Sequence, residues 1–159
     1  MNNTLLEIAI KEIDISTIDN AAAVLDMQKI AYQAEAEAAG VEELPYLEYS
    51  ISALEKSENT FIGAYVDDQL AGVLSFWITD DQTMDIHLFM TQPKYQRQGV
   101  ASTLLEHAKT SYPGLKKIIA QTGAENKPAI DFYKKHGIHF VCNIQVTPSF
   151  ELATFLRNL

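Results

Sequence analysis

A ten-residue segment, Pro93–Ser102, carries the residue types best suited to holding an anionic ligand. It reads PKYQRQGVAS and lies between a segment with strand-like alternation, Thr83–Met90, and a segment with helical spacing that begins at Val100. At a helix start about four backbone N–H groups lack intrahelical partners, and the helix dipole adds partial positive charge. Gly99 and Ala101 keep the approach to these groups open. The segment therefore predicts a binding site for a diphosphate.

Two well-known phosphate-binding patterns do not fit this segment. It lacks the lysine followed by Ser or Thr of a nucleotide-binding loop, and it lacks the three glycines of a dinucleotide-binding turn. A different phosphate-bearing ligand is indicated.

Two motifs resemble those of one enzyme family. The pattern Gln96-x-x-Gly99-x-Ala101 resembles the acyl-CoA loop of the GNAT superfamily of N-acyltransferases. A later segment, Asn126–Ile138, reads NKPAIDFYKKHGI and is similar to the family's segment of Asn, an apolar pair, Phe-Tyr and then Gly with an apolar residue. Both motifs stand in the family's order and at a suitable interval, and the expected order of elements follows the family over essentially the whole chain.

The resemblance implies a transferase that uses acetyl-CoA as co-substrate. It implies that the backbone at Leu88 and Met90 pairs with the pantetheine amides, where this strand splays from its neighbour. The remaining residues that it implies for CoA binding are Gln96, Arg97, Gln98, Gly99, Val100, Ala101, Ser102, Asn126 and Tyr133. The sequence departs from the family at Thr91-Gln92, because the family usually has an apolar residue two before the proline.

Acetyl transfer to an amine requires a proton acceptor, because an alkylamine with a pKa of about 10.4 is mostly protonated at neutral pH. Asp85 and His87 lie two apart on a predicted strand and so share one face, which makes either a candidate base. Each also has an ordinary interpretation: Asp85 as a solvated residue at a strand end, and His87 as a histidine packed against a helix.

Tyr133 resembles the family's tyrosine that donates to the leaving thiolate. Full proton transfer from a phenol of pKa about 10 to a thiol of pKa about 8.5 is uphill by roughly 2 kcal/mol, so a hydrogen bond to sulfur is its main expected contribution. Without a ligand role, Tyr133 would be a core aromatic residue, Asn126 a helix cap and Gln96 a solvated loop residue.

The fold class expected is α/β, a mixed sheet with helices on both faces, in which an antiparallel meander is followed by a parallel β-α-β crossover. Leu5–Ile15 has strand periodicity, Ser16 or Thr17 is placed to cap a helix from Ile18 to about Ala39, and Pro45 can open another. In the first helix Ile18, Ala22, Leu25 and Tyr32 fall near one helical face. The later segments expected as strands or helices are 61–66, 70–78, 83–90, 100–111, 117–121, 126–136, 139–146 and 151–156.

Length and composition agree with a single domain over residues 1–159, because 159 residues with 47% hydrophobic content can bury one core and no linker-like tract interrupts them. No secretory leader and no apolar run of about 20 residues is found, so we expect a soluble protein that does not enter a membrane. The lone Cys142 suits a reducing compartment, which makes the cytoplasm the expected location, and it is expected to be buried.

Charge separates along the chain. The whole chain carries −9, but between Lys94 and Lys135 eight basic and three acidic residues give +5, which leaves −14 elsewhere. Because the chain as a whole is acidic, we expect no nucleic-acid partner. The basic segment between Lys94 and Lys135 could attract a phosphate-bearing donor, and the acidic remainder could favour a cationic amine. The alternative is that surface charges cluster here without a function. The acids of the early helices could steer such an amine: Glu35, Glu37, Glu42, Glu43 and Glu48.

Other functions remain as alternatives. A noncatalytic acyl-CoA sensor would bind the donor without turnover, and an interaction domain would bind no CoA. No serine-hydrolase elbow or His-Glu-x-x-His pair occurs, and His136 and His139 around Gly137 do not suggest a metal site, so no metal is expected. The resemblance further implies a possible homodimer.

Overall fold

A seven-stranded mixed sheet organises the chain in the computed structural model, which describes residues 6–40 and 50–159. The strand order is β1-β2-β3-β4-β5-β7-β6. The strands are β1 (Ala9–Glu12), β2 (Thr60–Val66), β3 (Gln69–Ile78), β4 (Thr83–Thr91), β5 (Lys117–Gly123), β6 (His139–Thr147) and β7 (Phe150–Asn158). The helices are α1 (Ile18–Ala39), α2 (Ile51–Glu55), α3 (Val100–Ser111) and α4 (Lys127–Lys135), with a short 3₁₀ helix at Pro93–Tyr95.

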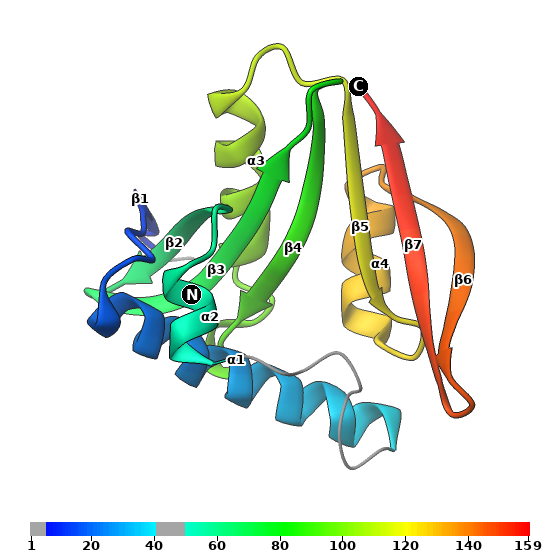
Figure 1. The fold of residues 1–159 in the computed structure, drawn as a ribbon, viewed down its shortest axis with the longest axis horizontal. Helices are drawn as coiled ribbons and strands as arrows, with labels where there is room; N and C mark the ends of the chain where they lie inside the picture. Colours follow the sequence, from blue (N-terminus) through cyan, green and yellow to red (C-terminus); the bar gives the residue numbers. More distant parts are fainter. Residues whose placement is uncertain (1–5, 41–49) are drawn as a thin grey trace, which may run out of the picture. The chain divides into compact units, whose positions relative to one another are not determined.

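The expected topology is confirmed. β2 pairs antiparallel with β1 and β3, and β5 runs parallel to β4 after the α3 connection, with Thr83–Asp85 opposite Lys117–Ile119. β7 then pairs antiparallel with both β5 and β6. The chain thus forms a meander followed by a parallel crossover, as the sequence predicted (Figure 1).

The described residues form two compact units. The first contains residues 6–31, 50–76 and 88–113, and the second contains residues 32–40, 77–87 and 114–159. The expectation of a single domain over residues 1–159 stays a prediction.

In the first unit, α3 packs on the middle of β3. Val100, Leu104, Leu105 and Ala108 form the fully buried stripe of this helix. A Cβ atom on Gly72 would lie 2.7 Å from Val100 Cγ1 and 3.2 Å from Leu104 Cδ1, so only glycine lets the helix approach the strand this closely.

In the second unit, helices cover both faces of the sheet. Side chains alternate along β7, so Leu152 and Phe155 lie on opposite faces. Tyr32 and Ala36 of α1 pack with Leu152 and Phe150, whereas Tyr133 of α4 stacks on Phe155 with ring centroids 5.4 Å apart. This arrangement places α1 and α4 on opposite sides of this part of the sheet (Figure 1).

Helix α1 has the expected bounds, and its most deeply buried residues lie beside the apolar face noted in the sequence. Thr17 is the residue that caps it, since Asn20 N donates to Thr17 Oγ1 at 3.3 Å. Of the expected face, Ala22, Leu25 and Tyr32 are half-buried, but Ile18 is 63% exposed. The fully buried stripe lies beside that face and consists of Ala21, Val24, Met27, Gln28 and Ala36. These positions also recur at helical spacing, and local periodicity alone did not distinguish the two stripes.

The second helix, α2, spans Ile51–Glu55. Ser50 caps it, because its Oγ accepts a hydrogen bond from Ala53 N at 3.0 Å, and the helix begins at Ile51. The predicted start at Pro45, together with Glu42, Glu43 and Glu48, lies outside the described residues.

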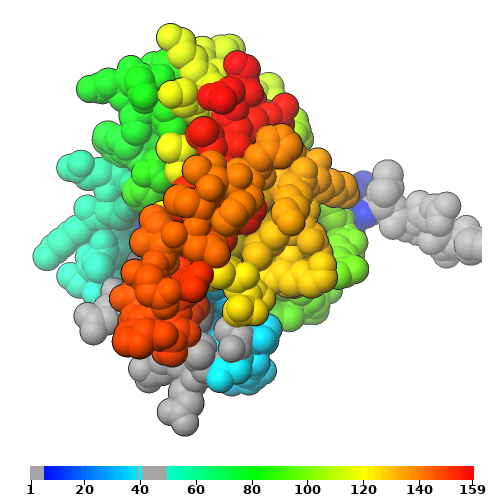
Figure 2. Space-filling model, turned by 90° about the vertical axis from the view of Figure 1, so that its right-hand side faces the viewer, coloured from blue at the N-terminus to red at the C-terminus, as the bar shows by residue number. Residues whose placement is uncertain are grey.

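Strand β6 forms one edge of the sheet and is exposed along nearly its whole length (Figure 2). Val141 is 55% exposed and Phe140 is 51% exposed. Cys142 is exposed as well, so the expectation that it is buried is wrong. Its small apolar character favoured burial, but an edge strand with uncovered faces offers none. None of the described helices is both long and apolar enough to cross a bilayer.

Candidate active site

The segment between β4 and α3 forms an exposed loop with unusual backbone geometry. Pro93–Tyr95 make one 3₁₀ turn, after which Arg97 and Gly99 both adopt left-handed conformations, with φ of 61° and 87°. Such a conformation costs a non-glycine residue roughly 1–2 kcal/mol. Strained residues of this kind cluster at ligand-binding sites, and adjoining left-handed and right-handed residues can turn successive N–H groups toward one anion.

The first turn of α3 has no side-chain cap. Its N-cap residue is Gly99, which has no side chain to accept a hydrogen bond, whereas Asn126 caps α4 and Thr17 caps α1. Thr103 donates its own N–H and Oγ1 to the Gly99 carbonyl, at 2.9 and 2.7 Å. The N-cap residue of α3 therefore offers no capping side chain to the backbone N–H groups at the helix start, which suits an anionic ligand.

Side-chain hydrogen bonds hold the loop against β3 within the first unit. Gln69 Oε1 on β3 accepts hydrogen bonds from Lys94 Nζ at 3.0 Å and from Tyr95 Oη at 3.2 Å. Gln98 folds back, and its Nε2 donates to the Lys94 carbonyl at 3.0 Å. Val100 is buried and fixes the start of α3 to the core. Two of the other loop residues, Ala101 and Ser102, are half-buried. The exposed ones are Gln96, Arg97, Gln98 and Gly99.

Strand β4 carries the two candidate bases and the two residues expected beside pantetheine. His87 Nε2 lies 3.2 Å from Asp85 Oδ2, and both side chains are nearly half exposed, at 43% and 45%. The side chains of Leu88 and Met90 are buried. Asp85 and His87 therefore form a mutual pair that solvent can reach.

Helix α4 presents Asn126 and Tyr133 with well-defined ends. Asn126 Oδ1 accepts a hydrogen bond from Ala129 N at 3.3 Å, and its Nδ2 donates to Thr122 Oγ1 at 3.1 Å. At the other end Gly137 is left-handed, and Ile138 N donates to the Tyr133 carbonyl at 2.9 Å. The predicted cap at Asn126 and the predicted stop at Gly137 are confirmed.

The Tyr133 side chain is almost completely buried and lies between aromatic rings. Phe155 and Phe132 flank it, with ring centroids 5.4 and 5.7 Å away. Burial raises the pKa of the Tyr133 phenol well above its ordinary value, and the negative charge of Glu35 raises it further. The phenol therefore keeps its proton at any physiological pH and acts as a hydrogen-bond donor.

Within the second unit, Asp85 and Tyr133 belong to opposite faces of the sheet. Asp85 pairs with Ile119, which pairs with Leu156, so these three side chains share a face. Tyr133 packs on Phe155, the neighbour of Leu156 on β7, and thus on the other face. The predicted site residues therefore form two groups in the second unit, and the loop with Leu88 and Met90 forms a third group in the first unit.

The sequence analysis did not single out two residues that contact or influence these groups, Gly72 and Glu35. Gly72 lets α3 begin directly on β3, and its signal was a lone glycine inside an apolar strand. Glu35 was only one of five acids, and no local pattern marked it as the residue whose charge reaches Tyr133. Among the described residues, no group of three or more His, Cys, Asp or Glu side chains is arranged to hold a metal ion.

Comparisons with known proteins agree with this architecture. The family model described as "Acetyltransferase (GNAT) family" matches residues 21–138. The ribosomal-protein-S18-alanine N-acetyltransferase of Escherichia coli superposes with a TM-score of 0.73 at 15% identity, covering 96% of this chain and 94% of that chain. The PaiA N-acetyltransferase of Thermoplasma acidophilum, solved with coenzyme A, superposes with a TM-score of 0.72 at 18% identity, covering 94% and 98%.

A curated relative matches in sequence. UPF0157 protein YqkA of Bacillus subtilis (strain 168) is 24% identical over 132 residues, which is 83% of this chain. The match covers only 38% of that protein's length. The two solved structures support the fold, and the family model extends over well more than half of the sequence. The chain therefore belongs to the acetyltransferase (GNAT) family.

Proposed function

We propose that this protein transfers the acetyl group of acetyl-CoA directly to a primary amine in a ternary complex. The observation that carries the proposal is the start of α3, where a glycine N-cap, a strained Arg97 and the absence of a side-chain cap coincide with the family's loop motif. The CoA diphosphate would accept hydrogen bonds from the N–H groups at Val100, Ala101 and Ser102. The PaiA structure contains coenzyme A, which supports CoA as the donor.

The remaining roles follow from chemistry. Leu88 and Met90 would offer backbone groups of β4 to the pantetheine amides, and Asn126 would contact the cofactor while it caps α4. The thiolate that leaves would accept a hydrogen bond from Tyr133. Because the raised phenol pKa makes proton transfer to sulfur more than roughly 2 kcal/mol uphill, Tyr133 would donate a hydrogen bond and retain its proton. Asp85 and His87 are candidate proton acceptors.

Calorimetric titration with acetyl-CoA tests the donor site. We expect the wild type to bind and Gly99→Glu to lose binding, because the new carboxylate repels phosphate at the helix start. Gly40→Glu is the matched control: both glycines have positive φ and open space around the Cβ position, so both variants carry similar backbone strain. Absence of binding by the wild type, or equal loss in both variants, would contradict the proposal.

Turnover separates the enzyme from a noncatalytic sensor. With acetyl-CoA bound, we expect acetylation of at least one primary amine in a broad panel of amino acids, polyamines, aminoglycosides and peptides. Binding without any turnover would instead favour an acyl-CoA sensor. The location in the cytoplasm and the homodimer stay predictions. A second copy would pair with the uncharged, exposed segment Phe140–Val146 of edge strand β6. Sedimentation of the wild type measures whether a dimer forms.

A further inference from the structure

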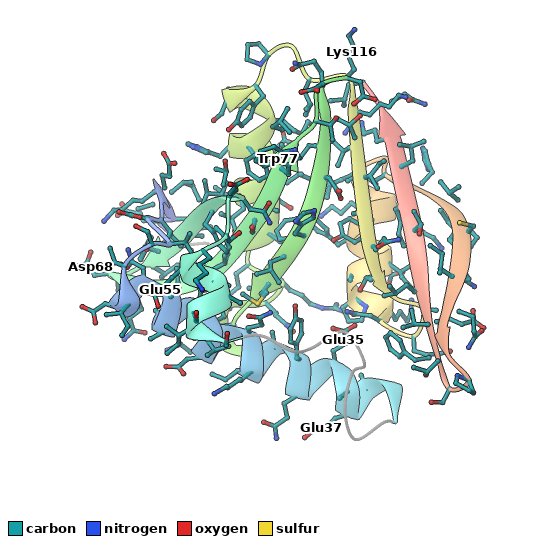
Figure 3. The ribbon with its side chains drawn as sticks, in the orientation of Figure 1. Glu35, Glu37, Glu55, Asp68, Trp77 and Lys116 are labelled. Atoms are coloured by element: carbon teal, nitrogen blue, oxygen red, sulfur yellow. The ribbon has the colours of Figure 1, made fainter. Side chains whose placement is uncertain are left out.

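The turn that joins β2 and β3 has a defined backbone geometry. Asp67 and Asp68 both have positive φ, of 51° and 62°, and Val66 pairs with Gln69 across them. Positive φ at both central residues matches a two-residue type I′ turn, whose twist fits that of the flanking strands. Figure 3 shows Asp68 at the outer end of this hairpin. The turn therefore fixes Gln69 as the first residue of β3.

The start of β3 contacts the segment that leads from β4 into the loop before α3. Gln69 Oε1 accepts hydrogen bonds from Lys94 Nζ at 3.0 Å and from Tyr95 Oη at 3.2 Å. Because a lysine ammonium can only donate, the Gln69 atom that faces it has to be the oxygen. Two residues further along β3, the Ala71 carbonyl accepts a bond from Gln92 N at 2.8 Å. The beginning of β3 thus holds the entry to the loop at two points.

Lys94 is held at both ends, although its side chain is exposed. Its ammonium, bonded to Gln69, also lies 5.0 Å from the centroid of the Tyr95 ring. Its backbone carbonyl accepts a hydrogen bond from Gln98 Nε2 at 3.0 Å. The side chain of Gln69 and the side chain of Gln98 therefore fix the 3₁₀ turn Pro93–Tyr95 from opposite ends of one residue.

The loop needs such support because Arg97 is strained. Arg97 is exposed, has a φ of 61° and follows Lys94 by three residues. A residue in this conformation persists only where its surroundings over-determine it. One exposed hydrogen bond typically contributes less than this strain costs, so several bonds have to act together. The two bonds at Gln69 and the one from Gln98 supply that support before any ligand arrives.

We propose that Gln69 is a positioning residue for the CoA diphosphate, acting through Lys94 and Tyr95 on the loop that precedes α3. The inference rests on the proposed acetyl-CoA site and adds to it a residue that lies outside both family motifs. A loop that is already ordered loses less conformational freedom when the donor binds, and affinity rises accordingly. The diphosphate is remote from the thioester carbon, so Gln69 affects binding of the donor and not the transfer step.

Calorimetric titration of Gln69→Met with acetyl-CoA tests this inference. Methionine has a similar length but lacks the carboxamide oxygen that accepts the two bonds. We expect the Kd for acetyl-CoA to rise roughly three- to tenfold. Gln33→Met is the matched control, because it makes the same change at an exposed position of α1, and its Kd should stay within about twofold of wild type. Equal affinity in the wild type and Gln69→Met would overturn the inference.

Steady-state kinetics on an amine accepted in the panel separates positioning of the donor from an effect on the chemistry. An interaction lost equally from the ground state and the transition state changes KM alone. We therefore expect KM for acetyl-CoA to rise by the same factor as Kd in Gln69→Met, with kcat within about twofold of wild type. A fall in kcat larger than the rise in KM would place the effect at the reacting carbon and overturn the inference.

A double-mutant cycle tests whether Gln69 acts through its two donors. In Lys94→Met/Tyr95→Phe both hydrogen bonds are already absent, so adding Gln69→Met should weaken acetyl-CoA binding by no more than about twofold. The full loss in that background would show that Gln69 acts through a different contact, and the inference would be overturned.

Trypsin cleavage of the ligand-free protein measures the loop directly. We expect cleavage after Arg97 to be at least about threefold faster in Gln69→Met than in wild type, with cleavage after the exposed Lys116 as the internal reference. Gln69→Glu should be cleaved like the wild type, because a carboxylate oxygen accepts the same two bonds. Unchanged cleavage in Gln69→Met, or equal acceleration in both variants, would overturn the inference.

The outcomes separate the inference from the function on which it rests. If the wild type binds acetyl-CoA and Gly99→Glu does not, while Gln69→Met binds as tightly as wild type, Gln69 is excluded and the donor site stands. If the wild type binds no acetyl-CoA, the proposed function and this inference fall together.

Discussion

At the scale of single residues, the most informative feature is backbone strain at Arg97. Among residues 6–40 and 50–159, four non-glycine residues have positive φ, and three of them, Asp67, Asp68 and Gln82, lie in the turns on either side of β3, where left-handed residues are common. Arg97 is the exception, because it lies in the loop before α3. Strain kept at such a position is consistent with a binding loop whose backbone must face a ligand.

Replacing Arg97 by glycine should separate stability from binding. Relief of roughly 1–2 kcal/mol of strain is offset by about 0.5–1 kcal/mol of added chain entropy, so we expect the free energy of unfolding to rise by about 0–1.5 kcal/mol. Acetyl-CoA affinity should nevertheless fall, because the loop loses a fixed conformation and a positive charge.

Urea unfolding and calorimetry measure the two effects. Gln82→Gly is the matched control, since Gln82 has nearly the same φ of 62° but lies outside the proposed site. We expect that control to change stability similarly without changing affinity. Unaltered acetyl-CoA affinity in Arg97→Gly would contradict a role for this loop.

At the scale of elements, the contact between β3 and α3 controls where the binding loop begins. Gly72 faces Val100, the first residue of α3, and the Met90 carbonyl of β4. Both strands and the helix therefore meet at a point where no side chain fits. The position of the helix start depends on this close approach.

Gly72→Ala should destabilise the protein. The added Cβ would lie 2.7 Å from Val100 Cγ1 and 3.0 Å from the Met90 carbonyl oxygen, and backbone atoms cannot move away cheaply. We expect a loss of about 1–3 kcal/mol in the free energy of unfolding, measured with urea, together with weaker acetyl-CoA binding.

Gly114→Ala provides the control for Gly72→Ala. Its Cβ would meet only Gln82 Oε1, at an ordinary 3.6 Å, and its φ is not positive. We expect a change within about 0.5 kcal/mol. A similar loss in both variants would mean that glycine content rather than the β3–α3 contact determines stability.

At the scale of the whole molecule, Tyr133 couples global stability to alkaline pH. Its pKa is raised from 10.0 in the folded state, mainly by burial and then by Glu35. Below about pH 10 the phenol is protonated in both states and adds no pH dependence. Above that pH the unfolded chain releases the proton while the folded chain retains it, so stability falls as pH rises.

Comparison of the wild type with Tyr133→Phe isolates this effect from the other six tyrosines. Urea unfolding between about pH 9 and about pH 11 should show a steeper loss of stability in the wild type than in the variant. Parallel losses would contradict the raised pKa. The phenylalanine preserves the aromatic packing, so the variant should fold.

The sequence by itself determined the local elements and the family motifs. The bounds of α1, the strands of the meander, the caps at Thr17 and Asn126 and the stop at Gly137 follow from periodicity and from backbone hydrogen bonds between near neighbours. The motif residues in the loop before α3 could also be identified from the sequence, because the start of a helix depends on residues that are close together in the chain. Their roles in binding stay predictions.

Only the tertiary structure decided how distant segments meet. The buried face of α1, the exposure of Cys142 on an edge strand and the fit of Gly72 against Val100 depend on which surfaces cover one another. Gln69 and Lys94 lie far apart in the chain, and nothing in their local sequences links them. Such contacts arise when folding buries apolar surface, which fixes side chains relative to partners far away in the chain.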